Sequence, residues 1–73
     1  MDHEEITWKI LRLAEKRSEV EEGCFTTEDY IRVCAQIYSA KMMPERDARR
    51  HLGWHPDKCE KVGEDVWRLL EDE

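Results

Sequence analysis

The chain has 73 residues and a formal net charge of −6, and 41% of its residues are charged while 40% are hydrophobic. A chain of this length forms one small domain with a marginal core, because folding buries only about 60% of the unfolded surface at this size. The hydrophobic content excludes a disordered chain, and no apolar run approaches the roughly 20 residues that cross a bilayer. We therefore expect a single cytoplasmic domain over residues 1–73, without a signal peptide or membrane contact.

Two helices are expected in the first half of the chain. The first runs over roughly residues 4–19, where Ile6, Ile10 and Ala14 recur at helical spacing. It ends in the charged sequence EVEEG. The second begins at CFTTEDY, where Thr26 and Asp29 have the spacing of a capping box with the shorter acid. The broad apolar face that follows, up to residue 38, predicts that this helix is central.

Two shorter helices are expected in the second half. Pro44 marks the start of a third helix, which ends at Leu52 with Gly53 directly after it. Pro56 repeats the start signal for a fourth helix, whose apolar positions are separated by three, four and three residues: Cys59, Val62, Val66 and Leu69. No alternating pattern predicts a strand. The expected fold is therefore all-α, a small orthogonal bundle of about four helices.

The junction of these last two helices has the spacing of a known motif. Ala48 and Leu52 face inward, Gly53 supplies a turn, and Cys59 and Val62 follow six and nine residues later. Over about 20 residues this resembles the helix-turn-helix class, winged-helix proteins included, and gives a helix-turn-helix-like segment over 45–71. The chain departs from the class at Arg49, where a small residue is usual. A β-hairpin wing is not expected after the last helix.

The resemblance implies binding to double-stranded DNA and a role in transcription regulation. Residues 41–61 carry a balance of +2, while residues 1–40 and 62–73 each carry −4. Cations in this segment are the candidates for phosphate contacts: Arg46, Arg49, Arg50, Lys58 and Lys61. A dimer would double these contacts, and Trp67 and Leu70 are the candidates for a homodimer contact. Glu60, Glu64 and Asp65 lie nearby and oppose binding.

Two other functions remain open. The same domain could act as a protein-protein interaction module or adaptor, with its acidic first and last helices against a basic partner. Alternatively, the sequence HPDK at residues 55–58 resembles the tetrapeptide of chaperone J domains and implies a co-chaperone. In that family the motif joins two antiparallel helices. Arg50 and Asp47 stand where the preceding helix of that family has apolar residues.

Enzymatic and metal-binding functions are not expected. His51, His55 and Cys59 are spaced four apart, as metal ligands on one helix would be, but Gly53 and Pro56 interrupt the helix between them. The three cysteines include no CxxC pair and are interpreted as free thiols. The three glycines are isolated, so no phosphate-binding loop exists. We therefore predict no catalytic residue, no cofactor and no metal.

Overall fold

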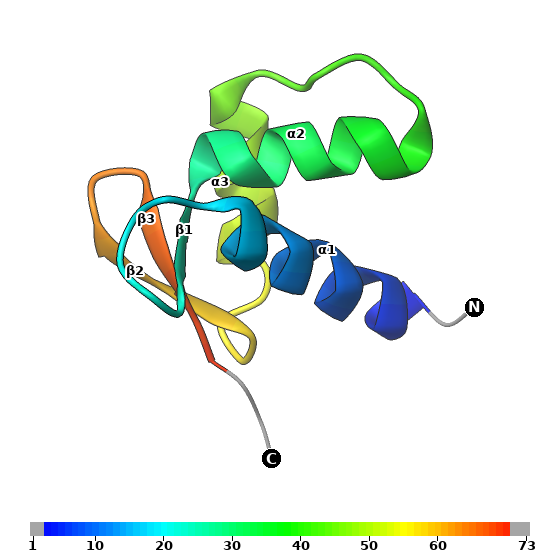
Figure 1. Ribbon diagram of the computed structural model, residues 1–73. Coiled ribbons are helices and arrows are strands. Elements are labelled where there is room, and N and C mark those ends of the chain that lie inside the picture. The colour runs from blue at the N-terminus through cyan, green and yellow to red at the C-terminus, as the bar shows by residue number, and fades with distance from the viewer. Residues whose placement is uncertain (1–2, 71–73) are drawn as a thin grey trace.

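Residues 3–70 form three helices and a three-stranded antiparallel sheet (Figure 1). The computed structural model describes residues 3–70, so residue 71, the end of the helix-turn-helix segment expected over 45–71, lies outside the description. The elements in chain order are α1 (His3–Arg17), β1 (Cys24–Thr26), α2 (Thr27–Tyr38), α3 (Glu45–Gly53), β2 (Cys59–Gly63) and β3 (Val66–Leu69). The strand order is β1-β3-β2, so the last strand lies between the other two.

The expected all-α fold is wrong. Residues 59–69, for which a fourth helix was predicted, form the hairpin of β2 and β3. On β3, Trp67 is buried and Leu69 half-buried, while Arg68 between them is exposed, which is the period of two of a strand. Arg68 lies opposite Glu60 on β2 and forms an ion pair with it. The three-four-three spacing of apolar residues thus coincided with a helical period.

The first two helices and the cap of the second are confirmed, and β1 lies between them. The Thr26 hydroxyl accepts a hydrogen bond from the Asp29 backbone N–H at 3.1 Å, and the Asp29 carboxylate accepts one from the Thr26 N–H at 3.1 Å. Both halves of the capping box are therefore present. After Tyr38, Ser39 adopts a left-handed conformation and ends α2.

The third helix is also confirmed, but a strand follows it. Pro44 occupies the N-cap position of α3, without a side-chain hydrogen bond, and the side chains of Ala48 and Leu52 are fully buried, as predicted. Gly53 is the last residue of α3 rather than the turn between two helices. A turn over residues 54–58 leads directly into β2. The expected partner helix is therefore replaced by the β2–β3 hairpin.

All three helices and the sheet contribute to one core. Leu11 of α1, Phe25 of β1 and Leu52 of α3 are fully buried, and α2 adds several nearly buried residues. Trp67 of β3 is 6% exposed, and its indole Nε1–H donates a hydrogen bond to the Thr27 hydroxyl at 3.0 Å. Since Trp67 belongs to this core, it is not available for the homodimer contact that the sequence suggested. Leu70 is half-buried.

The burial of Trp67 can be tested by truncating its ring. Trp67→Phe removes the hydrogen bond to Thr27 and leaves a cavity, so the free energy of unfolding should fall by about 2–4 kcal/mol. The matched control is Trp54→Phe, because Trp54 is 63% exposed and its replacement should change stability by less than about 0.5 kcal/mol. Urea unfolding followed by circular dichroism measures both. Equal effects of the two substitutions would contradict this core.

Candidate nucleic-acid interface

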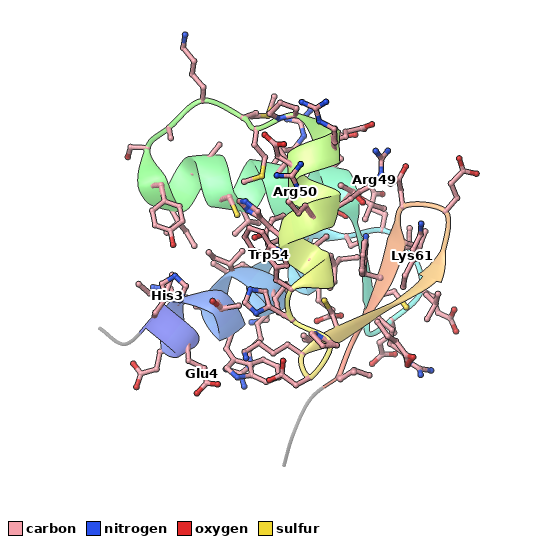
Figure 2. The ribbon with its side chains drawn as sticks, turned by 180° about the vertical axis from the view of Figure 1, so that it is seen from behind. His3, Glu4, Arg49, Arg50, Trp54 and Lys61 are labelled. Carbon is pink, nitrogen blue, oxygen red and sulfur yellow. The ribbon has the colours of Figure 1, made fainter. Side chains whose placement is uncertain are left out.

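The outer side of α3 carries two exposed arginines one helical turn apart. Arg46 is 83% exposed, and its guanidinium Nε lies 3.9 Å from the Asp47 carboxylate. Arg50, labelled in Figure 2, is exposed and forms no ion pair with another residue between 3 and 70. Residues four apart lie on the same side of a helix. Ala48 and Leu52 hold the opposite side of α3 in the core, so this arginine side faces solvent.

Arg49 contacts the hairpin instead of projecting freely from α3. Its Nε donates to Asp65 Oδ1 at 2.6 Å, and its terminal nitrogen donates to Asp65 Oδ2 at 3.1 Å and to Glu45 at 3.2 Å. The hydrogen bond from Arg49 lowers the pKa of Asp65, and the same bond raises the pKa of Arg49. Arg49 therefore joins α3 to the hairpin, and its charge is largely compensated within the protein.

Lys58 lies in the turn before β2 with only 7% of its side chain exposed. Its ammonium is 3.0 Å from the Asp57 carboxylate and 3.3 Å from the Glu4 carboxylate of α1. It also lies 5.6 Å from the ring centroid of Trp8. The hydrogen bond with Asp57 raises the pKa of Lys58 and lowers that of Asp57. Lys58 thus holds the start of α1 against this turn and does not face solvent.

Among the described residues of β2 and β3, Lys61 is the cation that forms no ion pair, since Arg68 pairs with Glu60. It lies opposite Trp67 in the register of the hairpin and is exposed. Figure 2 shows Lys61 on the same side of the molecule as Arg50. Of the five predicted residues, Lys58 is buried, and Arg49 is 41% exposed but bonded to Asp65. Arg46, Arg50 and Lys61 remain as exposed cations without a bond to another element in the described residues. We refer to these three as the α3–hairpin surface.

Sequence reasoning missed the residues that orient this surface. The Thr27 backbone N–H donates to the Asp65 carbonyl at 3.0 Å, and the Thr27 hydroxyl donates to the Asp65 carboxylate at 3.2 Å. Asp65 itself has φ 58°, a left-handed conformation. A short segment with Gly63 and two acids between valines is a hairpin signal. This signal could have identified the turn, although not the partners of Asp65.

The histidines and Cys59 do not form a metal site in the described part of the chain. No group of three His, Cys, Asp or Glu side chains there is placed to hold a metal ion. Cys59 is buried, and its thiol lies 3.7 Å from the Leu52 carbonyl and 3.9 Å from the His55 carbonyl. Burial raises the pKa of Cys59 to about 11, which disfavours the thiolate that a metal would need.

The HPDK sequence forms a turn and not a loop between two helices. The Lys58 N–H donates to the His55 carbonyl at 2.9 Å, and β2 begins at the next residue. Among residues 3–70, therefore, no second helix follows the motif, and the side chain of Lys58 is buried. The same residues include no helix with the length and apolar character needed to cross a membrane.

Comparison of the chain with protein-family models, with curated proteins and with solved structures gave no match. The site is therefore interpreted from its own geometry.

The role of Asp65 predicts a dependence of stability on pH. The pKa of Asp65 is lowered on folding. The ionised carboxylate therefore stabilises the fold above the pKa of an unfolded aspartate, about 3.9, and this stabilisation is lost as the pH falls through the pKa of the folded state. Asp65→Asn tolerates the left-handed backbone but removes the charge. We expect the variant to have a lower Tm than the native chain at pH 6, and the difference to shrink towards pH 2.5. Glu64→Gln, at the neighbouring position, is the control, and a pH-independent difference for Asp65→Asn would contradict the assignment.

The different environments of the two lysines give a second test. Lys58→Ala removes two hydrogen bonds and a packed aliphatic chain, so we expect a loss of about 1–3 kcal/mol in the free energy of unfolding. Lys61→Ala should change it by less than about 0.5 kcal/mol, because the side chain of Lys61 is exposed. Urea unfolding of the two variants measures the difference. If Lys61→Ala proved the more destabilising, the placement of both lysines would be wrong.

Proposed function

We propose that this chain is a small winged helix-turn-helix domain that binds double-stranded DNA through the α3–hairpin surface. The observation that carries the proposal is the position of α3. It is packed on α2 by one side, bears exposed arginines on the other, and is followed directly by a β-hairpin.

The order of elements supports this class of domain. In a helix-turn-helix, the first helix supports the second, and the second lies in the DNA major groove. Here α2 and α3 take these two positions, so the pair lies one helix earlier than the sequence suggested. The β2–β3 hairpin takes the position of the wing. The segment between α2 and α3, residues 39–44, is longer than the usual turn of about three or four residues.

The distribution of charge also supports this face. In α3, three arginines stand against Glu45 and Asp47, a balance of +1, and in residues 59–69 Lys61 and Arg68 stand against three acids, a balance of −1. These two segments together are neutral, so the net charge of −6 belongs to the rest of the chain. A polyanion is therefore repelled less at the α3–hairpin surface than the net charge of the whole chain suggests.

Three cations imply weak binding that depends strongly on salt. Each phosphate contact on duplex DNA contributes about −0.9 to the slope of log K against log salt, so three contacts give a slope of about −3. Contacts to phosphates carry no sequence information by themselves. Sequence preference would come from polar side chains of α3 at the floor of the groove.

The test is fluorescence anisotropy of a labelled random-sequence duplex at several salt concentrations. The double variant Arg46→Gln/Arg50→Gln removes two of the three cations. We expect it to bind about tenfold or more weakly at low salt and to reduce the slope by about two units. The matched control is Lys9→Gln/Lys16→Gln, which makes the same charge change at two exposed positions of α1.

The control shows whether DNA affinity depends on the α3–hairpin surface or on the net charge of the chain. If both double variants weaken binding equally, the net charge governs and the α3–hairpin surface is not the site. If the native chain binds no duplex even at low salt, DNA binding is wrong. In that event a protein partner becomes the better proposal.

A further inference from the structure

All three histidines of the chain line one pocket. The pocket has a volume of about 320 Å³ and lies between α1, α2 and the end of α3. His3 comes from the start of α1, His51 from the last turn of α3, and His55 from the turn after it. Figure 2 shows His3 on the same side of the molecule as Trp54. The volume is at the lower end of the range for small-ligand sites, about 300–1,000 Å³.

The walls of the pocket offer flat aromatic surfaces. The rings of His51 and Trp54 are stacked, with centroids 5.1 Å apart and planes inclined by 24°. Trp54 is nevertheless 63% exposed, and Tyr38, also at this pocket, is 55% exposed. Tyr30 and Ile10 are buried and add apolar lining. Exposed aromatic faces beside a hollow favour a planar ring that can stack on them.

The polar groups of the pocket favour an anion. The chain has 18 acidic residues, yet none is among the described residues that line this pocket. Three imidazoles supply N–H donors, and the carboxylate that acts on one of them, Asp57 near His55, does not line the pocket. Burial lowers the pKa of His55, and the nearby Lys58 lowers it further, while Asp57 raises it. A bound anion would favour the protonated ring. The imidazoles do not form a metal-ligand group within residues 3–70.

We propose that this pocket binds a small planar aromatic carboxylate, with its ring against Trp54 and its carboxylate accepting hydrogen bonds from the imidazoles. The ligand would fill the apolar interior and place its charge where the donors lie. This site differs from the α3–hairpin surface, and the proposal does not depend on DNA binding.

A pair of probes separates the charge from the ring. Indole-3-carboxylate and its neutral analogue indole-3-carboxamide have nearly the same size and shape. Each is titrated into the ¹⁵N-labelled chain, and amide and indole N–H shifts are followed by NMR at pH 6 and at pH 8. At pH 6 we expect the carboxylate to bind about tenfold more tightly than the amide, because charge-assisted hydrogen bonds are the stronger ones.

Binding of the carboxylate should weaken from pH 6 to pH 8, since the bound anion favours the imidazolium forms, whereas binding of the amide should not. The titratable and charged groups around His55 come from every adjacent element: His3 of α1, Tyr30, Cys34 and Tyr38 of α2, His51 of α3, and Asp57 and Lys58 of its own turn. Across this pH range the histidines are the groups with ordinary pKa values closest to neutrality.

Three variants locate the site. Trp54→Ala removes an exposed stacking surface and should weaken both probes about two- to tenfold. His51→Gln should weaken the carboxylate more than the amide. The control Val62→Ala alters a side chain that is 49% exposed on β2, outside the pocket, and should bind both probes as the native chain does. Well-dispersed amide spectra establish that each variant is folded.

Three outcomes would overturn the proposal. Absence of saturable shifts at millimolar carboxylate would show that the pocket takes no such ligand. Equal affinity for carboxylate and amide at both pH values, or shifts that map to residues away from the pocket, would remove the anion site. None of these outcomes bears on the duplex titration, so the two proposals can be rejected independently.

Discussion

The carboxylate of Asp65 joins three parts of the fold that are far apart in sequence. It accepts hydrogen bonds from Thr27 at the start of α2 and from Arg49 of α3, while the backbone carbonyl of Asp65 accepts one from the Thr27 N–H. Trp67 completes the connection by donating to the Thr27 hydroxyl from β3. The hairpin is thereby fixed relative to both helices. Strand pairing with β1 and the burial of Trp67 and Cys59 in the core also orient the hairpin.

The same constraint determines which cations remain for a partner. Arg49 is the central arginine of α3, but its two bonds to Asp65 direct it to the hairpin. Lys58 has a comparable role at the other end of the hairpin, because it binds Glu4 of α1. Of the six basic residues in segment 41–61, Arg49 and Lys58 are therefore bound to acidic groups of other elements. Basic side chains that a bound anion would need are thus used to stabilise the fold.

The parts of the fold that could be predicted were those whose sequence signals span only a few residues. The capping box of Thr26 and Asp29 spans three residues, and Pro44 acts on the next turn, so the starts of α2 and α3 were accessible from local sequence. The hairpin was not recognised, because Val62 and Val66 extended an apparently helical spacing. In the structure Val62 is 49% exposed, and the alternation of buried and exposed residues on β3 is that of a strand.

The candidate site was less predictable, for a related reason. Arg49 and Asp65 are 16 residues apart, and Lys58 and Glu4 are 54 apart, so no local pattern reports either pair. These tertiary contacts determine how exposed Arg49 and Lys58 are, and the amino-acid composition does not predict them. The three histidines also come together through tertiary packing, since α1 and α3 both pack on α2 and His3 then lines the same pocket as the other two.

The two proposed sites share α3 but lie at different parts of it. Arg46 and Arg50 are on its outer side, whereas His51 and Trp54 face the pocket at its end. Coupling between two sites requires an element with two arrangements that each ligand favours differently. Here Ala48 and Leu52 are fully buried, and Arg49 is bonded to Asp65, so α3 is held in one position by its core side and by the hairpin. A ligand in the pocket would therefore act on the rings of His51 and Trp54 locally rather than by displacing the arginines of α3.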